Sequence, residues 1–231
     1  MKSVSILSIG GSIVAPDKPD AEFLKKLRSL LFECSEATQT RYIIIIGGGG
    51  PCRVYQQACR DVRPDTVDND RLDWIGIMAT RLNAQLVSEV MVPGCKDPVV
   101  TDPTADISFT GDILVASGWK PGWSTDYIAV LLAERFGADR LINLSNIKKV
   151  YSADPKLDPN AVPLDYISWD EYGKMIGSEW TPGKNAPFDP VATKKAVALN
   201  LQVVTAGGRD IDNTRAILTG GSFEGTVMGR K

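Results

Sequence analysis

The residues with the clearest chemical potential in this sequence are four glycines at 47–50 that directly follow four isoleucines. Without a Cβ, glycine lets backbone N–H groups approach a ligand closely. Pro51 comes next, and proline suits the first turn of a helix. Free N–H groups and the helix dipole converge where a strand, a glycine turn and a helix meet, so anions bind at such junctions. A flexible linker is the alternative, but linkers carry serine and have no buried strand in front. The pattern therefore predicts a phosphate cradle.

A second, smaller turn repeats this design near the start of the chain. The apolar run 3–9 leads directly into Gly10, Gly11 and Ser12. We expect both turns to face one site.

The absence of histidine narrows the chemistry further. It excludes a Ser-His-Asp hydrolase, imidazole general bases and the commonest ligand of transition metals. Phosphoryl transfer remains the leading reaction, because its transition state needs positioning and charge more than covalent help.

Length and composition set wider bounds. A chain of 231 residues with 43% hydrophobic and 23% charged residues can form one α/β domain over 1–231. The net charge of -2 gives no general attraction to nucleic acid or to an anionic membrane. The four cysteines show no CxxC spacing, and we expect neither a metal site nor disulfides. With no signal peptide and no apolar run of membrane-spanning length, a cytoplasmic protein is expected.

The elements that would position these turns alternate along the chain. Strands are expected at 3–9, 41–46, 112–117, 140–145 and 202–206, with a short last one at 225–228. Helices are expected at 20–33, from Pro51 to about Arg63, from about Leu72, and at 127–136, 170–175, 191–199 and 213–218. Alternation of this kind predicts a mostly parallel sheet covered on both faces, with ligands at the carboxyl ends of its strands.

Apolar spacing predicts the buried faces of two helices. In the first helix it selects five residues, Phe23, Leu24, Leu27, Leu30 and Leu31, and in the helix from Leu72 it selects Ile75, Met78, Ala79, Leu82 and Leu86. Ser124, Thr125 and Asp126 offer side chains that could cap the helix at 127–136. The stretch 152–164 is dense in aspartate, proline and lysine and is expected to be an ordered loop or a lid, and the stretch 177–190 is expected to be irregular.

Three motifs in order make the pattern specific: PGWSTDYIAVLLAE, NLSNIKKVYSADPKLDP and FDPVATKKA. Together with the glycine turns they resemble the amino acid kinase family, most nearly its uridylate kinases of the archaeal type. The resemblance covers essentially the whole chain. It implies a three-layer α/β sandwich and a kinase that transfers the γ-phosphoryl group of ATP, with Mg²⁺, to UMP. It also implies a homo-oligomer, a hexamer built from dimers.

The same resemblance implies which residues would meet each nucleotide. The ATP side would comprise Ser8, Gly10, Gly11, Ser12, Gly48, Arg53, Ser145, Asn146, Tyr151 and Asp154. The UMP side would comprise Gly47, Asp73, Trp119, Lys120, Pro121, Gly122, Trp123, Ser124 and Thr125, with Asp73 on the ribose. Several of these have structural alternatives: Asp73, Thr125 and Asp126 could only cap helices, Asp154 could only form a turn, and the two tryptophans could be packing or subunit contacts.

This sequence departs from the family pattern at one chemically important position. Ser8 stands where many members carry a lysine that neutralises the transferring phosphoryl group. Lys148 and Lys149 replace an Asp-Gly pair after the strand 140–145, and together with Arg53 they are our candidates for the missing cation, with Lys184 in reserve. Both lysines could equally be solvated loop residues. Two other functions therefore stay open: a nucleotide- or oxoanion-binding protein without turnover, and a kinase of another small phosphorylated acceptor.

Overall fold

The computed structural model describes residues 2–64, 68–155, 157–176 and 186–230. The helices are α1 (Gly11–Val14), α2 (Ala21–Thr38), α3 (Gly49–Val62), α4 (Asn69–Val90), α5 (Thr125–Phe136), α6 (Trp169–Ile176), α7 (Pro190–Ala198) and α8 (Ile211–Thr219). The strands are β1 (Ser3–Ile9), β2 (Thr40–Ile46), β3 (Ile113–Ala116), β4 (Arg140–Ser145), β5 (Val150–Tyr151), β6 (Pro163–Leu164), β7 (Tyr166–Ile167), β8 (Gln202–Gly207) and β9 (Thr226–Met228).

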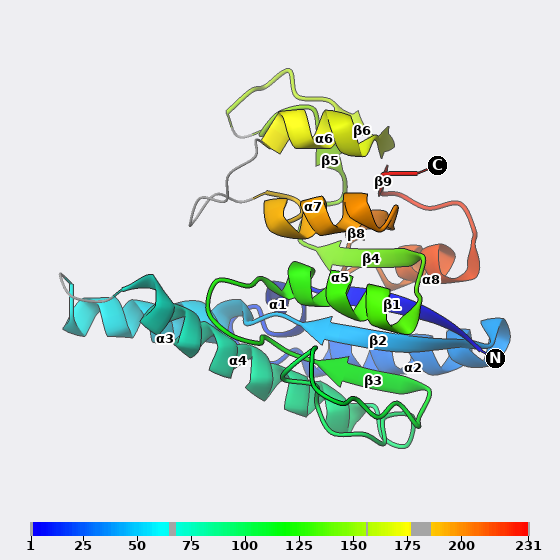
Figure 1. The fold of residues 1–231 in the computed structure, drawn as a ribbon, viewed down its shortest axis with the longest axis horizontal. Coiled ribbons are helices and arrows are strands. Elements are labelled where there is room, and N and C mark those ends of the chain that lie inside the picture. Colours follow the sequence, from blue (N-terminus) through cyan, green and yellow to red (C-terminus); the bar gives the residue numbers. More distant parts are fainter. Residues whose placement is uncertain (1, 65–67, 156, 177–185, 231) are drawn as a thin grey trace.

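Within these residues a seven-stranded sheet forms in the order β3-β2-β1-β4-β8-β9-β7. Its neighbours pair in parallel except for β8 and β9, which are antiparallel. The predicted mostly parallel sheet is confirmed. The carboxyl ends of β1, β2, β3, β4 and β8 therefore meet at one edge, which is the left-hand edge in Figure 1.

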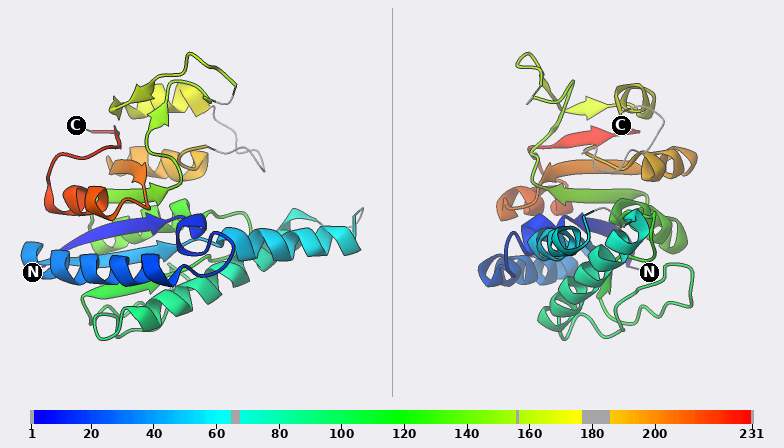
Figure 2. Two further views of the ribbon diagram at one scale, coloured as in Figure 1. Left: turned by 180° about the vertical axis from the view of Figure 1, so that it is seen from behind. Right: turned by 90° about the vertical axis from the view of Figure 1, so that its left-hand side faces the viewer.

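Helices cover both faces of the sheet, which gives the expected three layers (Figures 1 and 2). One face packs against α2, α4 and α8 around residues such as Leu27, Val87 and Ile217. The other packs against α5, α6 and α7 around residues such as Ile128, Tyr172 and Ala192. The central strands are buried on both faces, which explains why the isoleucine run of β2 shows no polar alternation.

The predicted buried face of α2 is confirmed, since all five of its named residues are buried. The prediction for α4 is wrong: Met78 and Leu82 are 58% and 70% exposed. The buried face of α4 runs instead through Leu72, Gly76, Ile77, Thr80, Asn83, Ala84, Val87 and Ser88. The pair α3 and α4 projects beyond the sheet, as Figures 1 and 2 show, and the outer side of α4 is exposed at Trp74, Met78 and Leu82.

Helix boundaries also differ in detail from the expectation. Helix α3 begins at Gly49, within the glycine run, and α4 begins at Asn69 after an Asp68 cap. Helix α5 begins at Thr125, and Ser124 is its cap because its hydroxyl oxygen accepts a hydrogen bond from Tyr127 N. Thr125 and Asp126 therefore do not cap this helix.

Candidate active site

The two glycine turns lie against each other at the carboxyl edge of the sheet. Gly10 N donates to Leu144 O at 2.9 Å and Gly47 N donates to Ile9 O at 3.0 Å, so each turn continues the ladder of its strand. A Cβ built on Gly11 would lie 2.1 Å from Gly49 N, and one built on Gly47 would lie 2.5 Å from Gly11 N. The prediction that both turns face one place is confirmed, because their backbones touch there.

Gly49 has a conformation that requires glycine. Its φ is +66°, and a Cβ at this position would also lie 2.4 Å from Ala15 O. Helix α3 begins at this residue, so its N-terminal amides start at the junction of the two turns. This arrangement suits a phosphate group.

Helix α4 holds in position both the glycine turn at residues 47–50 and the loop that follows β3. Asn83, only 3% exposed, donates from Nδ2 to Gly47 O at 2.9 Å and to Gly48 O at 3.0 Å. Thr80 Oγ1 accepts from Gly118 N at 2.8 Å. The carbonyl oxygens of Gly47 and Gly48 thus already accept hydrogen bonds from α4.

Asp73 continues this row on α4 and reaches the 119–125 loop. Its Oδ2 accepts from Gly122 N at 3.0 Å, and Arg81 Nη2 donates to Trp119 O at 3.1 Å. The structure therefore brings Asp73 to the predicted acceptor loop, where one oxygen of its carboxylate tethers the backbone.

The aromatic side chains of this loop form a stack. Trp123 lies on Tyr127 with ring centroids 4.3 Å apart, and Trp119 lies 6.1 Å from Trp123. Lys120 Nζ sits 3.9 Å from the centroid of the Trp119 ring. The tryptophans hence have packing partners inside the chain, as the structural alternative required.

Ser8 is buried, and its hydroxyl contacts the carboxylate of Asp126. Its hydroxyl, on a residue 3% exposed, donates to Asp126 Oδ1 at 3.2 Å, and Asp189 N donates to Asp126 Oδ2 at 3.3 Å. Burial, followed by the nearby Asp189 charge, raises the pKa of Asp126 to about 6. Burial also raises the pKa of Asp189, although Asp189 caps α7 by accepting from Ala192 N at 2.7 Å.

Arg53 links α3 to the glycine turn at residues 10–12. Its guanidinium donates to Ser12 Oγ and to Pro16 O, both at 3.2 Å. A second cation, Arg209, follows β8 at the same edge and pairs with Asp20 at 2.9 Å. Arg53 and Ser12 are thus brought together as predicted members of one site, and Arg209 is an addition that the sequence did not suggest.

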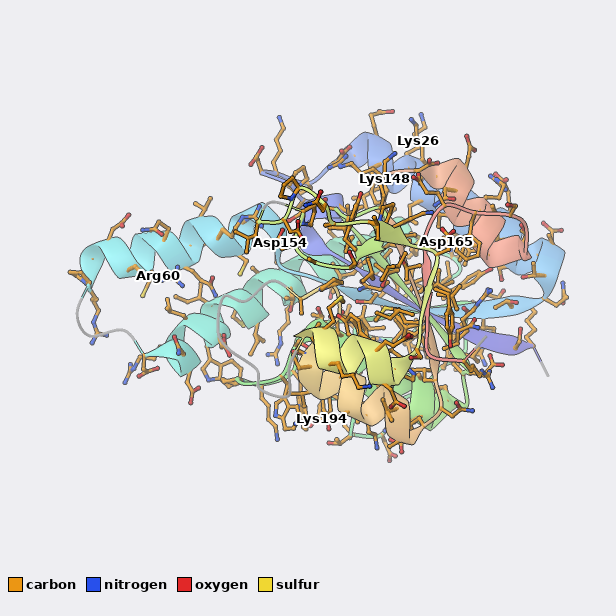
Figure 3. The ribbon with its side chains drawn as sticks, turned by 90° about the horizontal axis from the view of Figure 1, so that it is seen from above. Lys26, Arg60, Lys148, Asp154, Asp165 and Lys194 are labelled. Atoms are coloured by element: carbon orange, nitrogen blue, oxygen red, sulfur yellow. The ribbon has the colours of Figure 1, made fainter. Side chains whose placement is uncertain are left out.

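The lysines after β4 have different surroundings. Lys148 Nζ lies 3.5 Å from Glu224, and its side chain is 74% exposed. Lys149 is only 21% exposed and pairs closely with Asp165, whose hydrogen bond raises the pKa of the lysine. In the view of Figure 3, Asp154 lies on the side of Lys148 that faces the carboxyl edge of the sheet. Asp165 lies on the other side of Lys148. Lys184 lies outside the described residues.

The remaining predicted adenosine-side residues follow the same strand. Ser145 ends β4, accepts from Ile147 N at 3.3 Å through its Oγ, and accepts from Gly208 N at 2.9 Å through its carbonyl. Asn146 comes next, Tyr151 lies in β5, and Asp154 begins a turn in which its carbonyl accepts from Asp158 N at 2.9 Å.

Sequence reasoning missed Thr80, Asn83 and the pairing of Asp126 with Asp189. A signal existed for the first two, because positions 73, 80 and 83 are seven and three residues apart and share one helix face. No sequence signal places Asp189 beside Asp126, since the two are 63 residues apart.

Comparison with known proteins agrees with this geometry. The model of the amino acid kinase family matches residues 3–205. The chain therefore belongs to the amino acid kinase family, a class that the parallel sheet and the paired glycine turns also fit.

Within that family the chain is similar to uridylate kinases. It is 36% identical to the uridylate kinase of Methanospirillum hungatei over 228 residues, which is 97% of this chain and 94% of that protein. It is 35% identical to the uridylate kinase of Methanocorpusculum labreanum over 229 residues, again 97% of this chain and 94% of that protein. The crystal structure of the uridylate kinase from Archaeoglobus fulgidus superposes with a TM-score of 0.82 at 30% identity, covering 97% of this chain and 99% of that one.

Proposed function

We propose that this chain is a uridylate kinase that transfers the γ-phosphoryl group of ATP to UMP and forms UDP and ADP. The observation that carries the proposal is the contact between the two glycine turns, with the acceptor loop tethered next to them by α4. This arrangement offers backbone N–H groups to phosphates from two sides. The similarity to uridylate kinases over nearly the full length supports the same reaction.

On the ATP side, the turn of residues 8–12 and Gly48 contribute backbone, and Arg53 contributes a cation. Arg53 contacts only neutral oxygens among the partners described above, Ser12 Oγ and Pro16 O, so its charge remains available to a phosphate. Ser145, Asn146, Tyr151 and Asp154 lie along the continuation of the same edge and would receive the adenosine.

Magnesium fits this site as a companion of ATP. Among the described residues there is no cluster of three or more histidine, cysteine, aspartate or glutamate side chains. Mg²⁺ commonly keeps several waters and binds through substrate phosphates with one or two carboxylates, so it requires few protein ligands. When bound, it would neutralise charge on the phosphate oxygens.

On the UMP side, Gly47 and the loop 119–125 surround the acceptor. The Asp73 carboxylate uses one oxygen for Gly122 N and has further acceptor capacity for the ribose hydroxyls. Thr125 is the first residue of α5, where the free amides and the helix dipole favour the UMP phosphate. The stack of Trp119, Trp123 and Tyr127 gives this loop a rigid side.

Lys148 is the stronger of the two lysine candidates for the missing cation. Its exposed side chain is held only by a 3.5 Å ion pair, and such a surface pair contributes little stability. Lys149 is committed to Asp165. A mobile lysine that swings from Glu224 to the ATP phosphates would supply the charge that Ser8 lacks.

The buried Ser8 favours a second candidate function, a nucleotide- or oxoanion-binding protein without turnover. Its hydroxyl donates to the Asp126 carboxylate, in place of a lysine that could neutralise the phosphoryl group. A kinase of another small phosphorylated acceptor is the third candidate.

One experiment separates the three. The full chain is incubated with Mg-ATP and a panel of UMP, CMP, AMP and other monophosphates, and ADP and the diphosphates are measured. UDP as the main product establishes the kinase. Nucleotide binding without ADP formation supports the second candidate, and a preferred acceptor other than UMP supports the third.

The chain is also proposed to work as one domain, in the cytoplasm, and as a homo-oligomer, a hexamer built from dimers. No helix among the described residues is long and apolar enough to cross a membrane. The projecting pair α3 and α4 exposes Val54, Tyr55, Val62, Trp74, Met78 and Leu82, an apolar surface that a second copy of the chain would cover. Light scattering would give the mass, and a stable monomer at micromolar concentration would contradict the oligomer.

A further inference from the structure

A cavity of about 490 Å³ lies at the edge of the sheet opposite the glycine turns. Its lining includes Ser5, Tyr42, Arg140, Gln202 and Arg230. These residues come from the amino-terminal parts of β1, β2, β4 and β8 and from the C-terminal end of the described chain, at the right-hand edge of Figure 1. The volume is in the range of small-molecule sites.

The register of the sheet explains why polar side chains gather here. Ser5 lies opposite Tyr42, and Arg140 lies opposite Gln202. Ile6 pairs with Leu141, and Ser5 and Arg140 are the residues before them, so Ser5 lies beside Arg140. Four neighbouring strands thus present a tyrosine, a serine, an arginine and a glutamine in one row on one face of the sheet. The next residue of each strand is apolar.

One hydroxyl of this row is buried without a partner. Ser5 is 7% exposed, and its hydroxyl oxygen has no hydrogen-bond partner within the described residues. Tyr42 is 1% exposed; burial raises the pKa of its phenol, and a hydrogen bond with the Thr38 side chain opposes that rise. Buried polar groups are normally paired, because an unpaired one loses its interaction with water without compensation. The unpaired Ser5 hydroxyl in a cavity lined by two arginines indicates a ligand that supplies hydrogen bonds.

The cavity is lined by two arginines, Arg140 and Arg230, and by one aspartate, Asp139. The Arg140 side chain has no ion pair with another described residue. It lies near enough to Tyr42 for its charge to oppose the rise in pKa that burial gives the phenol. Arg230 pairs with Asp139 at 2.9 Å, but its side chain remains 42% exposed and can donate further. The hydroxyls of Ser3 and Thr40, 3.0 Å apart, extend the row to the rim.

This cavity is separate from the candidate active site. Tyr42 lies five residues before Gly47 on the same strand, which corresponds to about 17 Å at about 3.3 Å per residue. None of the residues assigned to ATP or UMP is among its lining residues.

We propose that this cavity is a second ligand site, which binds a small phosphate ester that also carries hydroxyl groups, such as a pentose phosphate. Arg140 and Arg230 receive the phosphate, because a guanidinium presents a planar fork of donors that matches phosphate oxygens. Ser5, Tyr42 and Gln202 receive the hydroxyls of the polyol, since each side chain can donate and accept.

The test is calorimetric titration of ribose 5-phosphate into the full chain in phosphate-free buffer, with ribose and inorganic phosphate as separate arms. Ribose 5-phosphate is expected to bind more tightly than either part alone. Arg140→Gln should weaken it by at least about tenfold, as expected for loss of a charged hydrogen bond. Ser5→Ala should weaken it while leaving the urea midpoint of the free protein unchanged or raised, because the lost hydroxyl had no partner.

Two matched controls locate the binding. Lys2→Gln removes a cation from the same edge of the sheet outside this cavity, and Asp73→Asn changes the residue proposed to hold the UMP ribose at the opposite edge. Both should leave ribose 5-phosphate binding in the cavity unchanged. The proposal is overturned if the wild-type chain shows no binding, if Arg140→Gln binds as well as wild type, or if Asp73→Asn abolishes binding. Equal affinity for inorganic phosphate and ribose 5-phosphate would overturn the polyol assignment.

Discussion

The raised pKa of Asp126 makes a quantitative prediction about stability. The carboxyl of this residue has a pKa of about 6 in the folded chain, against an ordinary value of 3.8, first because of burial and second because of Asp189. This difference corresponds to about 3 kcal/mol between the charged and neutral forms, an upper value because Asp126 keeps some contact with solvent. The cost is absent below pH 3.8, where Asp126 is protonated in both states, and complete above pH 6, where it is charged in both. The group therefore removes stability as the pH rises from about 4 to about 6.

Asp126→Asn should remove this cost. The amide oxygen can still accept from Ser8, whereas an amide nitrogen in the place of Oδ2 cannot accept from Asp189 N; that lost hydrogen bond costs the same at every pH and cancels when two pH values are compared. We expect the free energy of unfolding of the variant to be larger, relative to that of wild type, at pH 8 than at pH 4, by up to about 3 kcal/mol. The assay is urea unfolding followed by tryptophan fluorescence at both pH values.

Asp102→Asn is the matched control, because the pKa of that carboxyl is shifted in the opposite direction. Hydrogen bonds from the Thr104 side chain and backbone lower the pKa of Asp102, so the stability that its charge contributes is lost only below pH 3.8 and is present at both assay pH values. This variant should therefore differ from wild type by nearly the same amount at pH 4 and pH 8. If Asp126→Asn shows the same difference from wild type at pH 4 and pH 8, the buried carboxylate carries no such cost and the reasoning is refuted.

The remaining predictions concern the site and its supports. Asp73→Asn should raise the KM for UMP at least tenfold, since it removes charged hydrogen bonds to the ribose of about 1.5 to 3 kcal/mol; an unchanged KM in steady-state kinetics would rule out that role. Lys148→Ala should lower kcat more than Lys149→Ala with little change in KM, because the cation acts chiefly in the transition state; kcat values within twofold of wild type for both and for the double variant would refute the compensation. Asn83→Ala should destabilise the chain by about 1 to 3 kcal/mol in urea unfolding, because two turn carbonyls lose their buried donor; an unchanged midpoint would contradict that support. Trp74→Glu should lower the mass found by light scattering, and an unchanged mass would move the subunit contact elsewhere.

The order of the elements could be predicted from the sequence because it depends on local patterns. The isoleucines of β2, the glycine turns and the helix periodicity of α2 each occupy a few neighbouring residues, and a buried parallel strand differs from a surface helix at that range. The sequence motifs also sufficed to suggest the family, which the family match then confirmed. The apolar stripe of α4 misled because periodicity shows that a helix has an apolar face but does not say what covers it. Met78 and Leu82 lie on the side that no other part of the described chain reaches.

Only the tertiary structure decided which distant side chains meet. Asp189 lies against Asp126, and Asn83 lies against the glycine turn at residues 47–50. Parallel strands and their crossovers bring these separate segments to one edge of the sheet. The row of Tyr42, Ser5, Arg140 and Gln202 follows from strand register, which no single segment contains. Local residue preferences act over a few positions, whereas these contacts depend on how four strands align. The sequence by itself therefore determined the class of chemistry and the elements that carry it, and the packing of the sheet determined the partners of each functional group.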